Sequence, residues 1–140
     1  MTRKFWEHFN HGSDIGVRGT GPTQEEAFEQ AAVALTAVLT DPKGIKEDRS
    51  IEITCEAPDA ELLLNEWLNA VIYQMAVRKM VFARYEVELR DTQLNSRAWG
   101  ETVDPVRHQP AVEVKGATLT ELKVGKIVTG NWVAQCVVDV

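Results

Sequence analysis

Acidic residues near both ends of the chain carry the oxygen donors that a hard cation prefers. Asp14 follows the turn-prone cluster His11-Gly12-Ser13, and Asp139 precedes Val140, whose terminal carboxylate is a third anionic donor. No lysine or arginine adjoins either acid. If the fold brings the two ends of the chain together, these oxygens form a site for a hard cation.

Ordinary structural roles also account for these residues. Serine and aspartate side chains stabilise turns by bonding to the backbone, and glycine supplies the dihedral angles that turns need. A residue beside the chain end is commonly solvated and frayed. The run Trp132–Val138 argues against fraying, because its apolar residues predict a terminal strand that holds Asp139 at the end of a sheet.

Lys115 is the candidate for contact with a phosphate group. It alternates with Val112 and Val114 in the run Ala111–Ala117, and so shares a strand face with Glu113. A surface lysine beside a glutamate needs no function. A lysine on a strand lined with small residues can instead present its ammonium to a phosphate as a point charge.

A polar segment, Gly100–Pro110, holds a second group of candidates. It contains Glu101, Asp104, His108 and two prolines, and a loop of this length is often functional. Solvation of an exposed loop explains the same residues. In an alternative hypothesis, Glu101 or His108 is the base of a metal-dependent hydrolase.

The composition indicates one globular domain, residues 1–140, that does not bind nucleic acid strongly by itself. The chain has 140 residues, a formal net charge of −6 and a pI near 5.1. A protein that holds a phosphate backbone normally carries a basic patch. The usual glycine-rich nucleotide-binding motifs and the zinc-protease and serine-hydrolase motifs do not occur in the sequence.

The cysteines and the N-terminal residues indicate a reducing compartment. Cys55 and Cys136 stand far apart in alternating apolar runs, which predicts reduced core residues and not a zinc site or a disulfide. The first twenty residues lack the apolar stretch of a signal peptide, and no segment has the character of a membrane span. We therefore expect a cytoplasmic protein with no membrane contact.

Hydrophobic periodicity predicts an α+β fold. One helix should begin after Thr23, which forms a capping box with Glu26, and a second after Asp59. The outward face of the first helix is acidic. Expected strands cover residues 4–9, 14–20, 51–55, 81–89, 94–98, 111–118, 121–128 and 132–139. We expect two layers, with both helices packed on one face of a mainly antiparallel sheet.

Five segments, taken in order along the chain, resemble the archease family. They are His11-x-x-Asp14-Ile15-Gly16, Glu66-Trp67-Leu68-Asn69 with Tyr73, Ala98-Trp99-Gly100-Glu101 followed by Asp104 and His108, Val114-Lys115-Gly116-Ala117-Thr118, and a tryptophan strand that ends at Asp139-Val140. The resemblance covers essentially the whole chain. The sequence departs from the family at Asn10 and Gly12, where an acid and a threonine are usual, and at Leu119, where an aromatic residue is common.

The resemblance implies an accessory protein and not a free-standing enzyme. Archeases activate the RtcB-type GTP-dependent ligase, which joins 2′,3′-cyclic phosphate or 3′-phosphate RNA ends to 5′-hydroxyl ends in tRNA splicing and RNA repair. They promote guanylylation of the ligase and its multiple turnover. The implied partner is therefore the ligase, through which this protein meets tRNA or broken RNA.

The resemblance also implies particular roles for residues of this chain. The metal ligands of archeases match Asp14, Asp139 and the carboxylate of Val140, and their important lysine matches Lys115. The implied cofactor is a divalent ion, namely Ca²⁺, with Mg²⁺ or Mn²⁺ as alternatives. Further candidates for the site are His11, Glu101, Asp104 and His108.

Two other hypotheses stay open at this point. A chaperone-like module for an RNA-modifying enzyme would protect its client from aggregation even after loss of Asp14 and Asp139. A metal-dependent phosphoesterase would hydrolyse a phosphate ester without any partner.

Overall fold

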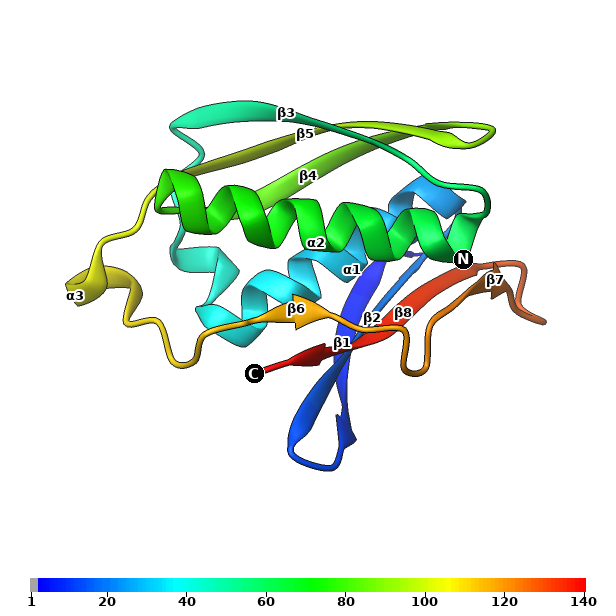
Figure 1. Ribbon diagram of the computed structural model, residues 1–140, viewed down its shortest axis with the longest axis horizontal. Coiled ribbons are helices and arrows are strands. Elements are labelled where there is room, and N and C mark those ends of the chain that lie inside the picture. The colour runs from blue at the N-terminus through cyan, green and yellow to red at the C-terminus, as the bar shows by residue number, and fades with distance from the viewer. Residues whose placement is uncertain (1–2) are drawn as a thin grey trace.

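The computed structural model describes residues 3–140 and contains two antiparallel sheets with helices between them (Figure 1). The first sheet has the order β1-β2-β8, and both β6 and β7 pair with the other edge of β8. The second sheet has the order β3-β5-β4. The strands are β1 (Phe5–His11), β2 (Asp14–Gly21), β3 (Arg49–Glu56), β4 (Met80–Arg90), β5 (Gln93–Thr102), β6 (Gly116–Ala117), β7 (Lys123–Lys126) and β8 (Trp132–Asp139).

Both predicted helices begin directly after the residues that were expected to cap them, Thr23 and Asp59. The helices are α1 (Gln24–Leu39), α2 (Ala60–Arg78) and the short α3 (Pro105–His108), and a 3-10 turn covers Pro42–Gly44. The Thr23 hydroxyl accepts a hydrogen bond from the Glu26 amide at 3.1 Å, and an Asp59 carboxylate oxygen accepts one from the Leu62 amide at 2.8 Å. These bonds satisfy amides that the first turn of a helix leaves free.

The α+β class is confirmed, but the layers differ from the prediction. α1 contacts β2 and β8 of the first sheet and also β4 of the second sheet, so it lies between two sheets and not on one face of a single sheet. As a result, none of its residues is exposed, and the acidic outward face that we expected is partly covered. Periodicity shows which residues of a strand alternate but not which strands pair, so it could not separate the two sheets.

Trp67 of α2 lies at the centre of the core and is fully buried. Its ring is stacked 6.3 Å from that of Phe28 and stands edge-on to that of Tyr85 at 5.8 Å, measured between centroids. The indole N–H donates to the Ser96 hydroxyl at 2.8 Å, so this buried donor is satisfied. The core therefore joins α1, α2 and the second sheet through one aromatic side chain.

Both cysteines are unpaired, as predicted. Cys136 is buried, and burial raises the pKa of its thiol to about 12. Cys55 is half-buried, and burial raises the pKa of its thiol to about 11. Both thiols therefore stay protonated near neutral pH, as expected of structural cysteines.

Several predicted strands differ in length from the prediction, and the strand expected at 121–128 covers only Lys123–Lys126. The segment 111–118 is a strand only at Gly116–Ala117, because its partner β8 ends at Asp139, which stands opposite Gly116. β5 continues to Thr102, which pairs with Met80, so the expected polar loop begins later and contains α3.

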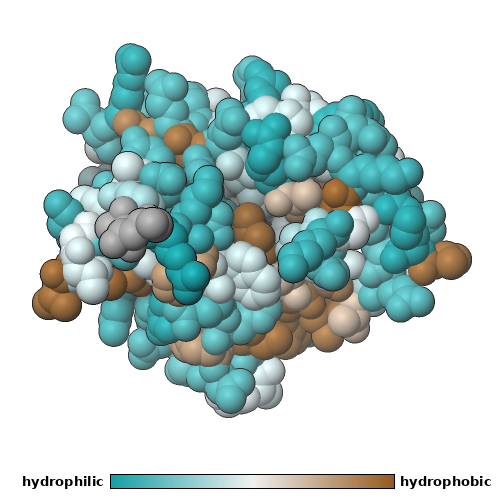
Figure 2. All heavy atoms as spheres, turned by 180° about the vertical axis from the view of Figure 1, so that it is seen from behind, coloured by the Kyte–Doolittle hydropathy of each residue, from teal (hydrophilic) through white to brown (hydrophobic). Residues whose placement is uncertain are grey.

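Hydrophilic side chains cover most of the face opposite to that of Figure 1, where apolar side chains gather in limited groups (Figure 2). No helix within residues 3–140 is long and apolar enough to cross a membrane.

Candidate functional site

Asp14 begins β2 at the tip of the first hairpin. β1 and β2 pair from Phe5 opposite Thr20 to His11 opposite Asp14, which leaves Gly12 and Ser13 as the turn. Gly12 has a φ of 61°, in the left-handed region that glycine enters without strain. The turn predicted from the sequence is confirmed, and it presents His11 and Asp14 at one end of the first sheet.

β8 brings Asp139 to the same end of this sheet. β2 and β8 are antiparallel, with Ile15 opposite Val138. Continued by one residue, this register sets Asp14 opposite Asp139. The Cβ atoms of directly opposite residues in such a pair are roughly 4.5–5.5 Å apart, and their side chains lie on one face. Two acids separated by most of the chain are thus neighbours.

β6 lies on the other side of Asp139. Gly116 stands opposite Asp139, and the Lys115 amide donates a hydrogen bond of 2.8 Å to the carbonyl oxygen of Asp139. Lys115 therefore lies beside the end of β8. Figure 1 shows the C-terminus in this position, with β6 on one side and the hairpin on the other. Three distant segments therefore meet at the end of β8.

The side chains of Asp14, Lys115 and Asp139 make no hydrogen bond or ion pair with other side chains or backbone within residues 3–140. Lys115 and Asp139 are exposed, and Asp14 is half-buried. The three groups are thus available to a ligand or partner.

The donors at this end of the sheet fit a hard cation by their chemistry. The carboxylates of Asp14 and Asp139, and the terminal carboxylate predicted for Val140, offer only oxygen, which suits Ca²⁺, Mg²⁺ or Mn²⁺ better than soft metals. Within residues 3–140, no cluster of three or more His, Cys, Asp or Glu side chains is arranged to hold a metal. Because Ca²⁺ takes roughly six to eight oxygen ligands, an ion held here would keep positions for water or for phosphate oxygens.

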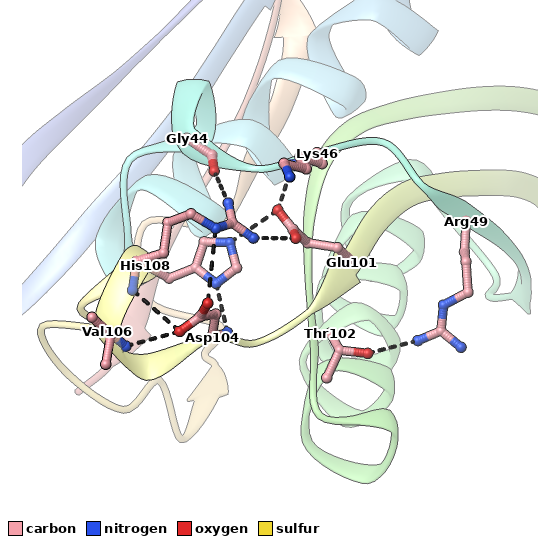
Figure 3. Close-up of polar contacts among 9 residues, drawn as sticks. Gly44, Lys46, Arg49, Glu101, Thr102, Asp104, Val106 and His108 are labelled. Carbon is pink, nitrogen blue, oxygen red and sulfur yellow. Dashed lines mark hydrogen bonds and ion pairs between the residues drawn. The ribbon is translucent and has the colours of Figure 1, made fainter.

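Glu101, Asp104 and His108 form a second cluster, in which they bond to one another and to neighbouring residues (Figure 3). Glu101 Oε2 accepts a hydrogen bond from the Lys46 amide at 2.6 Å and lies 3.1 Å from His108 Nε2. His108 Nδ1 accepts from the Asp104 amide at 2.8 Å, so the proton of the neutral ring is on Nε2 and is donated to Glu101. Arg107 forms an ion pair with the other oxygen of Glu101.

This cluster anchors the segment around α3. The Arg107 guanidinium, together with the Lys46 amide and the His108 ring, holds the pKa of Glu101 at about 2, although burial acts in the opposite direction. Asp104 caps α3 by accepting from the Val106 amide. These contacts give all three candidates a structural role.

Two asparagines of α2, Asn65 and Asn69, contact the strand that follows Lys115, and the sequence did not lead us to assign them a role. Asn69 bonds to both backbone groups of Ala117, and Asn65 donates to the carbonyl oxygens of Ala117 and Thr118. The feature of the sequence that could have identified them is their spacing of four residues, which sets two side-chain amides on the same face of a helix.

Comparison with known sequences identifies close relatives of the whole chain. Residues 6–140 match the Archease protein family (MTH1598/TM1083). The chain is 37% identical to Protein archease of Pyrococcus furiosus over 139 residues, which cover 96% of this chain and 98% of that protein. It is also 37% identical to Protein archease of Pyrococcus abyssi over 141 residues, which cover 98% and 99%.

Solved structures share the fold. The solution structure of protein 1598 of Methanobacterium thermoautotrophicum has a TM-score of 0.79 at 24% identity, covering 96% of this chain and 98% of that one. The crystal structure of a Thermotoga maritima archease, described as a possible chaperone, has a TM-score of 0.62 at 17% identity and covers 96% of each chain. The family match and the relatives that align over nearly their full length show that the chain belongs to the archease family.

Proposed function

We propose that this protein activates a GTP-dependent RNA ligase of the RtcB type by promoting guanylylation of the ligase, and thereby its multiple turnover in tRNA splicing and RNA repair. The observation that carries the proposal is the meeting of Asp14, Asp139 and Lys115 at one end of the first sheet. Membership of the archease family supports an accessory role.

In this proposal, the site acts on the phosphates of the nucleotide bound to the ligase. Lys115 presents an exposed ammonium on the residue that bonds to Asp139, where it would neutralise negative charge that develops on a phosphate. Asp14, Asp139 and the carboxylate of Val140 are the proposed ligands of a divalent ion, Ca²⁺ or alternatively Mg²⁺ or Mn²⁺. When bound, such an ion supplies positive charge to phosphate oxygens.

The charge of the chain favours action through a partner. With a net charge of −6, the protein is poorly suited to hold RNA, so the ligase holds both the RNA and the nucleotide. The two unpaired cysteines are compatible with the cytoplasm as the place where the two proteins meet.

A multiple-turnover ligation assay tests the proposal. RNA with a 3′-phosphate and RNA with a 5′-hydroxyl are incubated with GTP, the cognate ligase and sub-stoichiometric amounts of this protein. We expect repeated ligation and more guanylylated ligase with the protein than without it, and no change in RNA or GTP with the protein alone. A guanylylation rate that is independent of the protein would refute the proposal.

A chaperone-like role is a second candidate, and the description of the Thermotoga maritima archease as a possible chaperone favours it. It predicts protection of an RNA-processing enzyme from thermal aggregation. The double variant Asp14→Asn, Asp139→Asn separates the two candidates, because protection should survive these substitutions whereas ligase activation should not.

A further inference from the structure

β6, which follows Lys115, is weakly held by its own sheet. It has only two residues, and it pairs with β8 along one edge. Lys115 stands just before this strand and is exposed. The direction of its side chain therefore depends on whatever fixes Gly116 and Ala117 from the other edge.

A side chain of α2 occupies that other edge. Asn69 Oδ1 accepts a hydrogen bond from the Ala117 amide at 2.9 Å, and Asn69 Nδ2 donates to the Ala117 carbonyl oxygen at 3.0 Å. One carboxamide thus satisfies both backbone groups of a strand residue, as a neighbouring strand would. Because one atom accepts and the other donates, the amide has a single allowed orientation.

The two hydrogen bonds between the Asn69 side chain and Ala117 are called the Asn69 clamp below. Asn65, one helical turn earlier in α2, strengthens this clamp. The Asn65 Nδ2 donates to the backbone carbonyl oxygens of Ala117 at 3.1 Å and Thr118 at 3.0 Å. The backbone carbonyl oxygen of Asn65 accepts from Asn69 Nδ2 at 3.1 Å. β6 also lies close against the clamp, since a Cβ atom added to Gly116 would be 3.4 Å from Asn69 Oδ1.

We propose that Asn69, supported by Asn65, is a positioning residue that directs Lys115 toward the phosphate in ligase activation. Lys115 lies between the bond from its own amide to Asp139 and the Asn69 clamp two residues further on. Loss of the Asn69 bonds removes what fixes the backbone at Ala117, two residues after Lys115, and so frees the Lys115 side chain to change direction. This inference rests on the proposed function.

The variants Asn69→Ala and Asn69→Asp test the clamp in two ways. Alanine removes both hydrogen bonds. Aspartate keeps the acceptor for the Ala117 amide but has no donor, so the bonds to the Ala117 and Asn65 carbonyl oxygens are lost and a carboxylate oxygen faces the Ala117 carbonyl oxygen. Gln74→Ala is the matched control, because Gln74 is a half-buried amide side chain on the same helix whose side-chain hydrogen bond within residues 3–140 is to Arg78 and not to β6.

The first measurement is the guanylylation rate of the ligase at increasing concentrations of each full-length variant. We expect the plateau rate to fall by about 10- to 100-fold in both Asn69 variants, because a small displacement of a positioned group can cost that much. The half-saturating concentration should stay unchanged, since docking does not depend on the clamp. Gln74→Ala should match the wild type. If folded Asn69→Ala protein gives the same plateau rate of guanylylation as the wild type, the inference is overturned.

The second measurement does not need the ligase. Amide hydrogen exchange should become faster at Lys115 in both Asn69 variants and at Ala117 in Asn69→Ala, while the amides in the core of α2 stay protected. If the exchange rate at Lys115 is the same in the Asn69 variants and the wild type, the positioning role of Asn69 is wrong, whatever the ligase assay shows. If the wild-type protein does not activate the ligase, the proposed function is wrong, but the exchange result still tests whether Asn69 holds Lys115. If Asn69→Ala does not fold, Asn65→Ala removes only the supporting bonds and should show the same changes to a smaller degree.

Discussion

The Lys115 amide donates a hydrogen bond of 2.8 Å to the carbonyl oxygen of Asp139. This bond joins the backbone of the candidate cationic residue to the backbone of one candidate acid, and the register of β2 with β8 sets Asp14 on the other side of Asp139. Because the bond is made by backbone atoms, substitution of either side chain leaves it in place. Effects of such substitutions on function can therefore be separated from effects on folding.

Lys115→Ala should abolish ligase activation and leave the protein folded. The side chain is exposed and makes no hydrogen bond or ion pair within residues 3–140, so the free energy of unfolding should change by less than about 0.5 kcal/mol. Guanylylation assays and thermal melts measure the two effects. Lys126→Ala, which removes an exposed lysine of β7, is the control. Full activation by folded Lys115→Ala protein would make Lys115 an ordinary surface residue.

Asp139→Asn should weaken binding of Ca²⁺ or Mn²⁺. The substitution keeps the shape of the side chain but removes one negative charge, and the affinity of an oxygen site depends on the charge of its ligands. Asp14→Asn should act in the same way. Titration calorimetry measures the affinity, and Asp91→Asn, at the turn between β4 and β5, is the control. Equal affinity in the Asp139→Asn and wild-type proteins would exclude Asp139 as a ligand.

A short neutral extension after Val140 should also weaken cation binding, because it converts an anionic carboxylate into a neutral peptide carbonyl and crowds the end of β8. An extension of the same sequence before Met1 is the comparison. Calorimetry and ligase turnover are measured for both proteins. If the C-terminal extension changes neither quantity, the Val140 carboxylate is not a ligand, and Asp14 and Asp139 must be assessed by themselves.

Glu101→Gln should remove part of the acid sensitivity of the fold. The folded pKa of Glu101 is about 2, below its ordinary value of 4.5, chiefly because of Arg107. Its contribution to stability is therefore complete above about pH 4.5 and is lost as the pH falls toward 2. Urea unfolding from pH 6 to pH 2 should show a wild-type advantage that shrinks across this interval. A difference that stays constant with pH would contradict the assignment.

Gly19→Ala should destabilise the protein strongly. A Cβ atom on Gly19 would lie 2.1 Å from the Ala27 carbonyl oxygen and 2.2 Å from the Ala31 amide nitrogen, and these backbone atoms of α1 cannot turn away. The expected loss is about 1–3 kcal/mol or more in the free energy of unfolding, measured with urea. Gly125→Ala is the control, because its Cβ would meet no atom within 4 Å. Equal unfolding midpoints for the two variants would contradict the close packing of α1 on β2.

Local features of the structure were predictable from the sequence. The Gly12-Ser13 turn, the caps at Thr23 and Asp59 and the apolar stripe around Trp67 depend on residues only a few positions apart. Such interactions can be recognised in the sequence, because the geometry of turns, caps and helices favours particular residue types at short, fixed spacings. The candidates Asp14, Asp139 and Lys115 were also chosen from residue type and context.

Long-range relationships were decided only by the tertiary structure. The pairing of β2 with β8 makes neighbours of residues 14 and 139, and the division of the strands into two sheets covers α1 on both sides. The same holds for Asn69, whose bonds to Ala117 connect residues 48 positions apart. Periodicity shows which face of an element is buried, but strand partners and side-chain clamps are selected by how all the elements pack together, which no local pattern records.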